Sequence, residues 1–265
     1  MSRMWGLNAV AAILLAAAGA AAAATAPICP DRPSKSTGPC TVPQGDWQIE
    51  IGLVDWTHDD AGGRSDLVQW GNTAVKYGIS SRADLELWVT PLVTSSVSSG
   101  GMREHHSSFG DTLLRMKYAL TPDDAPVQVA LDPFIKLPTA GHRLGNGKVE
   151  GGLLLPIAVP IGKGPLTVSL DPELDVLADA DGRGRHAATQ QVFNIGLQAS
   201  DRLSVSAELW AMWDWDSAGT ARQRSADGSI AYLVNQDLQL DAGANFGLNR
   251  QTPEVELYTG VSLRF

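Results

Sequence analysis

The chain has 265 residues, and its 29 acidic against 20 basic side chains give a formal net charge of −9. This excess of acid argues against a nucleic-acid partner, because binding to phosphate backbones requires a basic surface. Beyond residue 24, no stretch approaches the roughly twenty apolar residues that a membrane-spanning helix needs. The sequence therefore favours either an exported soluble protein or a membrane β-barrel.

The first 24 residues have the pattern of a secretory signal peptide. Arg3 is followed by an uncharged, alanine-rich run over residues 9–24, which ends in the small residues that a signal peptidase accepts. The run is too short for a typical transmembrane helix. We therefore predict a signal peptide at residues 1–24, a mature chain that begins near Thr25, and export to the periplasm.

Residues 25–44 form a proline-rich segment that holds the only two cysteines, Cys29 and Cys40. Because the periplasm is oxidising, we predict a disulfide bond between them. A lipid-modified Cys29 is a weaker alternative, since the residues before it, Ala26, Pro27 and Ile28, do not resemble a lipobox. Free thiols or a metal pair are weaker still, because the segment has no further Cys and no nearby His.

From residue 45 to residue 265, apolar and polar side chains alternate in segments of about ten residues, separated by turn-forming residues. The clearest segment spans residues 166–176. Its odd-numbered polar residues include Asp171, Glu173 and Asp175, whereas leucine and valine occupy the opposite face. Three carboxylates on one face cannot lie in a dry core, because unpaired buried charges cost several kcal/mol. That face must therefore contact water.

The alternation predicts twelve strands, at residues 46–56, 67–79, 84–94, 110–120, 127–138, 148–159, 166–177, 190–199, 203–213, 224–234, 238–248 and 254–265. An even number fits a single-chain bacterial barrel, so we expect an all-β fold, an antiparallel transmembrane β-barrel. The breaks tend to alternate in length. Short ones are expected at the periplasmic side and longer external loops at residues 57–66, 95–109, 178–189 and 214–223.

Aromatic residues support the barrel, because Trp and Tyr collect at membrane interfaces. Trp47, Tyr118 and Tyr232 fall near periplasmic strand ends, and Trp70 has the wrong parity, which predicts a bulge. The last strand ends with the alternating Val261, Leu263 and terminal Phe265. This pattern looks like the signal read by the barrel assembly machinery, which we expect as a partner.

Several short motifs resemble those of the MetA-pathway of phenol degradation family of transporters. They are Asp31-Arg32-Pro33, the run over residues 41–50, Leu85-Glu86-Leu87, Gly110-Asp111, Lys117-Tyr118, Lys136-Leu137-Pro138-Thr139 and Leu240-Asp241-Ala242-Gly243. The resemblance implies an outer-membrane transporter-like barrel associated with the catabolism of aromatic compounds. It supplies no catalytic residues.

Charged residues of the lumen-facing parity are the first candidates for a solute path. They are Glu50, Glu86, Asp111, Arg115, Lys117, Asp132, Lys136, Lys148, Glu150, Asp171, Glu173, Asp175, Glu208, Asp241, Glu254, Glu256 and Arg264. They could line a wet, negatively charged pore. Equally, they could form salt bridges that fill and brace a narrow barrel.

The same parity also carries large apolar side chains, namely Trp88, Phe134, Leu154, Trp210, Met212 and Tyr258. They could form a path for an aromatic or hydrophobic solute, stacked on Trp88 or Trp210. The alternative is that they pack against an inward-folded loop or against the N-terminal segment.

Catalysis and metal binding find little support. The five histidines, at positions 58, 105, 106, 142 and 186, all fall in expected external loops, and there is no nucleophile elbow beside them. The run Asp179-Ala180-Asp181-Gly182 resembles the start of a calcium loop, but Arg183 and Arg185 follow where acids should be. We expect no catalytic residues, no metal and no cofactor.

These patterns together predict a Gram-negative outer-membrane channel for passive passage of small, hydrophobic or aromatic solutes. The expected partners are membrane lipid and lipopolysaccharide, which the basic residues 183–186 could contact. Two alternatives stay open, a structural barrel with a sealed lumen and a barrel lipid hydrolase that uses a serine near His105 or His106. The solute and the position of the N-terminal segment are not encoded in any recognisable motif.

Overall fold

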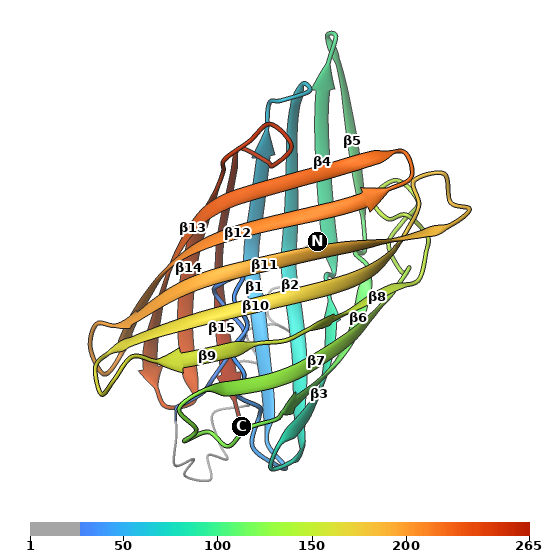
Figure 1. Cartoon of the computed structure of the whole chain (residues 1–265). Helices are drawn as coiled ribbons and strands as arrows, with labels where there is room; N and C mark the ends of the chain where they lie inside the picture. The colour runs from blue at the N-terminus through green and yellow to red at the C-terminus, as the bar shows by residue number, and fades with distance from the viewer. Residues whose placement is uncertain (1–26) are drawn as a thin grey trace, which may run out of the picture.

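The computed structural model describes residues 27–265 as one antiparallel sheet that closes on itself into a barrel (Figure 1). The predicted signal peptide lies outside the described residues. The strands are β1 (Trp47–Asp59), β2 (Arg64–Ser80), β3 (Ala83–Val89), β4 (Leu92–Ser99), β5 (Met102–Ser108), β6 (Thr112–Ala119), β7 (Gln128–Leu137), β8 (Glu150–Leu154), β9 (Ile157–Pro160), β10 (Leu166–Ala178), β11 (Arg185–Gln198), β12 (Leu203–Asp216), β13 (Gly219–Asn235), β14 (Leu238–Gly247) and β15 (Val255–Arg264).

The fifteen segments within residues 27–265 make twelve barrel strands, as predicted. β3 and β4 both pair with β2, so they are two parts of one barrel strand. In the same way, β5 continues β6 beside them, and β8 and β9 both pair with β7 and β10. Pro91 and Pro156 stand at two of the three interruptions, because proline cannot donate a ladder hydrogen bond. Pairing of β1 with β15 closes the barrel.

Burial is inverted relative to a soluble protein. The largest fully buried side chains include Lys76, Lys117 and Glu50, whereas Leu209 and Leu174 are each 56 % exposed. Alternation along every strand produces this pattern, since neighbouring side chains point to opposite faces of the sheet. The barrel therefore presents an apolar outside and a polar inside, as transmembrane barrels do.

Aromatic side chains lie on the outer face near both ends of the barrel, and β2 is irregular at Trp70, although its pairing with β1 and β4 shows no register shift there. Trp47 and Tyr232 are 45 % and 44 % exposed near the end that holds the C-terminus, and Phe246 is 53 % exposed toward the opposite end. Trp70 is 46 % exposed and precedes Gly71, whose φ of 66° breaks the regular strand geometry. The irregularity turns Trp70 to the outside.

The expected long external loops were wrong. β4 and β5 are joined by residues 100–101 alone, and β12 and β13 by residues 217–218. Serine, glycine and charged residues interrupt the alternation of apolar and polar side chains in these regions. The strands nevertheless continue there, because backbone hydrogen bonds between neighbouring strands do not depend on that alternation. As a consequence His58, His105, His106 and His186 lie in strands, and only His142 lies in a loop.

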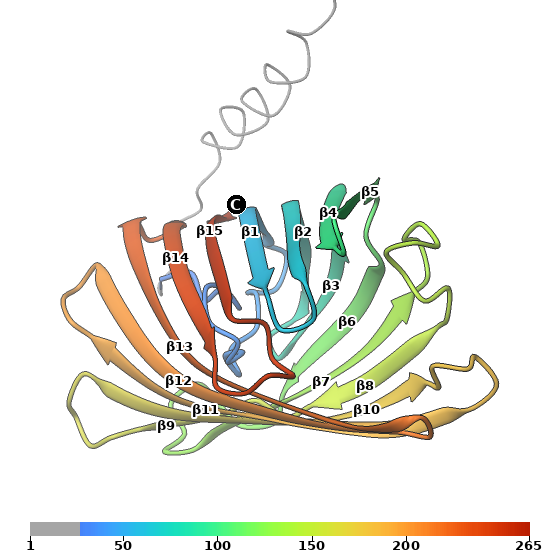
Figure 2. The ribbon, with the colours of Figure 1, turned by 90° about the horizontal axis from the view of Figure 1, so that it is seen from above.

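The N-terminal segment, residues 27–46, lies inside the barrel. Figure 2 shows this blue chain enclosed by the strands. The amide of Ile28 donates to the carbonyl of Gln236 at 2.7 Å, and Gln44 forms a parallel bridge with Gly78 near the same end of the barrel. Gly78 permits this approach because a Cβ there would overlap the backbone of Pro43. We call residues 27–46 the lumen segment.

Among residues 27–265, no helix is long and apolar enough to cross a membrane.

Candidate functional site

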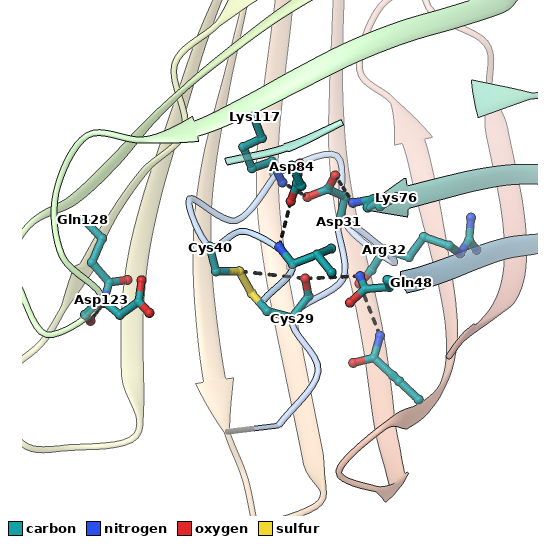
Figure 3. The surroundings of a disulfide bond; sticks show 12 residues. Cys29, Asp31, Arg32, Cys40, Gln48, Lys76, Asp84, Lys117, Asp123 and Gln128 are labelled. Carbon is teal, nitrogen blue, oxygen red and sulfur yellow. Dashed lines mark hydrogen bonds and ion pairs between the residues drawn. A yellow bond between two sulfur atoms is a disulfide. The ribbon is translucent and has the colours of Figure 1, made fainter. Parts of the chain in front are cut away.

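The lumen segment is closed into a loop by the predicted disulfide bond between Cys29 and Cys40 (Figure 3). Gln48, which is almost fully buried on β1, donates its side-chain amide to the carbonyl of Cys29 at 3.5 Å. On the other side of the loop, the amide of Val42 donates to the carboxylate of Asp84 at 2.7 Å. The loop is therefore attached to the barrel wall as well as to itself.

Asp31 is a buried anchor of the lumen segment. Figure 3 shows Lys76 and Lys117 converging on its carboxylate, with which both form ion pairs. Lys76 also lies 2.7 Å from Glu50, and all these side chains are almost inaccessible. Burial alone would raise the pKa of Asp31, but the positive charges of Lys117 and Lys76 hold it well below its usual range. Asp31 is therefore an anion at neutral pH, held between two buried cations.

Arg32 continues the attachment. The amides of Asp31 and Arg32 both donate to Glu50, at 3.0 and 3.1 Å, while the Arg32 guanidinium pairs with Asp241 at 2.9 Å. The same guanidinium lies 5.9 Å from the ring centre of Tyr258. Gly260 on β15 makes room for it, because a Cβ there would overlap the guanidinium.

The turn at residues 34–37 contacts the opposite wall. The amides of Lys35 and Ser36 each donate to Glu208 at 3.0 Å, and the Ser36 hydroxyl donates to Asp171 at 2.6 Å. Lys35 Nζ lies 3.1 Å from Asp227. Three carboxylates on β10, β12 and β13 therefore hold one short turn across the lumen.

Most other predicted lumen charges brace the wall. Arg115 pairs with Asp132, and Lys136 lies 2.9 Å from Asp111 and 2.8 Å from Glu150. These pairs favour the bracing interpretation for this part of the barrel.

Trp88 belongs to the same braced region. Its indole N–H donates to Glu86 at 2.7 Å, and the cations of Lys76 and Arg115 lie 5.7 and 5.4 Å from its ring centre. The ring is enclosed by charges and takes no part in either of the cavities described next, so the predicted stacking role of Trp88 is not supported.

Two cavities flank the turn. The first has a volume of about 280 Å³, and its walls include Lys35 and Thr37 together with Arg115, Phe134, Leu154, Asp171, Glu173 and Trp210. The second, about 250 Å³, lies toward the end of the barrel that holds the C-terminus, and its walls include Pro33, Ser34 and Ser36 with Thr167, Ser169 and Asn194. Because residues 33–37 contribute to both, the turn separates two halves of the lumen.

The predicted lumen residues thus fall into three groups, and Asp171 belongs to two of them. Arg115, Phe134, Asp171, Glu173 and Trp210 line the first cavity; Glu50, Lys117, Asp171, Glu208 and Tyr258 contact the lumen segment; Glu86, Trp88, Asp111, Asp132 and Lys136 brace the wall. Asp175 is buried on β10, and one of its carboxylate oxygens forms no hydrogen bond with the described residues.

Sequence reasoning missed Asp31, Lys35, Lys76 and Asp227. Two of them carried a readable signal, since Lys76 alternates with Val75 and Tyr77, and Asp227 is out of phase with Ile230 and Tyr232. Asp31 belongs to one of the motifs that resemble the family, but no pattern assigned a contact to Asp31 or Lys35, because a segment without secondary structure has no periodicity.

The histidine pair proposed for a hydrolase does not form a catalytic arrangement. His105 and His106 pair with Ser96 and Ser95 across β4 and β5, and His106 Nε2 lies 3.3 Å from Glu104. Within residues 27–265, neither imidazole is hydrogen-bonded to a serine hydroxyl.

Comparison with known proteins agrees with this geometry. A family model described as MetA-pathway of phenol degradation matches residues 30–265. The COG4313 outer membrane channel from Pseudomonas putida F1 has a similar structure, with a TM-score of 0.65, 15 % identity, and coverage of 85 % of this chain and 97 % of that one. The NanC porin matches with a TM-score of 0.54 and 11 % identity, over 81 % of this chain and 98 % of that one. The KdgM porin matches with a TM-score of 0.50 and 11 % identity, over 82 % of this chain and 99 % of that one. A sequence search of curated proteins found no match.

Proposed function

The chain belongs to the MetA-pathway of phenol degradation family, and from that premise we propose that it is a passive channel of the bacterial outer membrane for small solutes. The apolar outside requires a lipid environment, because leucines that are half exposed to water would aggregate. The polar lumen offers a route through that barrier. No energy coupling, cofactor or catalytic group is part of the proposal.

The first cavity is the observation that carries the solute class. Phe134, Leu154 and Trp210 provide apolar surface, and Arg115, Asp171 and Glu173 provide hydrogen-bonding groups in the same walls. A flat ring can pack on an aromatic side chain while a single hydroxyl reaches a charged group. This combination suits a small monoaromatic alcohol such as phenol, in keeping with the description of the family.

The size of the cavity limits the solute. Its volume of about 280 Å³ lies at the lower end of small-molecule sites, which span roughly 300–1,000 Å³. One single-ring compound fits, whereas an oligosaccharide or a peptide does not. Passage beyond this cavity requires the turn at residues 34–37 to move, because that turn stands between the two cavities.

The remaining partners follow from the surface and the chain ends. Within the basic run at residues 183–186, Arg183 lies in the exposed turn before β11 and Arg185 begins that strand, where both could contact lipopolysaccharide. Val261 and Leu263 on β15, with Phe265 directly after it, would provide the assembly signal. Residues 1–24 would act as the export signal and be removed.

Uptake of phenol into proteoliposomes tests the proposal. Trp210→Ala removes the aromatic wall of the cavity and should reduce the rate by several-fold. Trp213→Ala is the matched control, because Trp213 lies on the same strand with the opposite parity and lines neither cavity. It should transport phenol at the rate of the unmodified protein.

Two results would contradict the proposal. If folded protein in liposomes takes up no small solute at all, the barrel is sealed and has a structural role. If both tryptophan variants transport phenol at the same undiminished rate, the cavity is not the binding site.

A further inference from the structure

His186 lies at the external rim of the barrel, where carboxylates from its own hairpin and from the next one surround it. It is the second residue of β11, whereas Asp179 belongs to the preceding turn and Asp214 and Asp216 end β12. Two neighbouring hairpins, β10–β11 and β12–β13, therefore supply one cluster. The cluster borders a cavity of about 350 Å³ that Asn146, Lys148 and Glu150 also line.

The two ring nitrogens of His186 have different surroundings. Nδ1 lies 2.8 Å from Oδ1 of Asp179 and 3.6 Å from Oδ2 of Asp216. Nε2 lies 2.8 Å from Oδ1 of Asp214. The side chain of His186 is only 8 % exposed, and its Nε2 is buried without a hydrogen bond to any described residue, because the Asp214 oxygen lies off the N–H direction.

Backbone contacts fix the carboxylates in place. Asp216 accepts hydrogen bonds from the amides of Ala180 at 2.8 Å and Ala218 at 2.6 Å. Gly184 clears the space for Asp179, because a Cβ there would overlap its carboxylate. The ligand atoms of Asp179, His186 and Asp216 all lie within 4.8 Å of one another. The cluster is thus organised before any ligand arrives.

The charges within the cluster do not balance. Three carboxylates surround one imidazole, which contributes at most one positive charge. Lys148 is the lysine that lines the same cavity, and its ammonium donates to the carbonyl of Gly182 at 3.1 Å. A divalent cation would supply the missing positive charge between carboxylates that are already held close together.

We propose that Asp179, His186 and Asp216 bind one divalent transition-metal ion of the Zn²⁺ class. His186 Nδ1 and one oxygen from each aspartate would be the protein ligands, with solvent from the cavity completing the coordination. A nitrogen and two carboxylate oxygens suit such ions, whereas Ca²⁺ and Mg²⁺ prefer oxygen alone. On metal binding, a small rotation of the imidazole would align Nε2–H with the Asp214 oxygen 2.8 Å away, and this hydrogen bond would leave the Nδ1 lone pair free for the metal.

The bound ion would connect the β10–β11 hairpin to the β12–β13 hairpin at the external mouth. Strand pairing between β11 and β12 ends at Ala188 and Asp214, so the backbone ladder does not join the turns beyond that point. The metal would stabilise the rim at the point where the ladder stops, independently of what the lumen transports.

Equilibrium dialysis with Zn²⁺, followed by metal analysis of the folded protein in detergent, tests the inference. We expect about one Zn²⁺ per chain, loss of that ion in His186→Ala, and roughly 10- to 100-fold weaker binding in Asp214→Asn. His58→Ala is the matched control, since His58, Asp60 and Glu254 form the other group of potential ligands within residues 27–265, and a more exposed one. It should bind Zn²⁺ like the unmodified protein.

Amide hydrogen exchange at the external rim provides a second measurement, which does not require the bound metal to be quantified. Zn²⁺ should slow hydrogen exchange at residues 179–186 and 214–218 in the unmodified protein and leave it unchanged in His186→Ala. The inference is overturned if the folded protein binds no Zn²⁺, if His58→Ala rather than His186→Ala abolishes binding, or if equimolar Ca²⁺ displaces the ion.

Discussion

Lys35 Nζ lies 3.1 Å from Oδ2 of Asp227, so a side chain of the lumen segment is paired directly with the barrel wall. The same ammonium is 3.1 Å from the hydroxyl of Ser225 and 5.2 Å from the ring centre of Trp210. Lys35 therefore contacts both the strand that holds the turn and the aromatic wall of the first cavity. This relationship links the position of the segment to access through the lumen.

Asp227→Asn should loosen the turn at residues 34–37. The substitution leaves the partly buried Lys35 ammonium without its anion, and loss of one member of a buried pair costs about 3–5 kcal/mol. The remaining exposure of Lys35 reduces that cost, so we expect roughly a tenfold rise in the open fraction of single-channel recordings. Asp201→Asn changes an exposed turn residue with no contact to the segment and should leave the recordings unchanged. Equal recordings from both variants would refute the role of the pair.

Gly260→Ala should displace Arg32 without unfolding the barrel. The new methyl group would overlap the guanidinium, which is the flexible end of its side chain and can move away from Asp241. Gly228→Ala is the control, since its Cβ would meet its nearest neighbour at 3.7 Å, an ordinary contact. Tryptic cleavage after Lys35 should be faster in the first variant only, while both migrate as folded barrels in electrophoresis without heating.

Removal of the disulfide bond should release the lumen segment further. The bond joins residues 11 positions apart, and closing a loop of that size stabilises by about 3 kcal/mol in the chain-entropy model. A double Cys29→Ser, Cys40→Ser variant should show faster hydrogen exchange across residues 27–42. Exchange within β10 to β14 should stay as it is, because those strands do not depend on the bond. Unchanged exchange in the segment would show that its wall contacts suffice.

Acid should weaken the hold on the segment through Asp31. The pKa of Asp31 is lowered in the folded protein. Ionised Asp31 therefore contributes its full stabilisation at any pH above the ordinary aspartate pKa of about 3.9. This contribution is lost as the pH falls from there toward the lowered pKa. Channel opening should therefore increase between about pH 4 and pH 2. Asp31→Asn removes the titrating group and should flatten this part of the profile. If channel opening depends on pH in the same way in Asp31→Asn and in the unmodified protein, other carboxylates cause the response to acid.

The barrel was predictable because its outer face contacts lipid and its inner face contacts a polar lumen. These two environments require apolar and polar side chains to alternate along each strand. Residues such as Glu208 and Leu209 must face opposite sides of the sheet, and this requirement repeats in all twelve strands. The ends of the strands were not predictable in the same way. At Ser95–Ser99 and at Asp214–Asp216 the strands leave the apolar layer, so pairing of the backbone continues without alternation of side chains.

The site was predictable only in part, for a related reason. Parity places Arg115, Phe134 and Trp210 on the inner face, but it carries no information about which of them line a cavity and which are covered. That depends on the path of the lumen segment, which follows from individual contacts such as Asp31 with Lys117. Likewise the cluster around His186 joins two hairpins, and the run Asp179–Gly182 read alone predicted no metal.

The most direct test of a path through the lumen is phenol flux with the lumen segment fixed to the wall. The hydroxyls of Ser34 and Ser229 lie 3.5 Å apart, so a double Ser34→Cys, Ser229→Cys variant can form a cross-link that holds the turn between the two cavities. Mass spectrometry would verify that pairing, and Ser34→Cys alone would be the control. The account predicts that the cross-linked protein loses phenol flux while the control retains it. Undiminished flux through the cross-linked protein would contradict it.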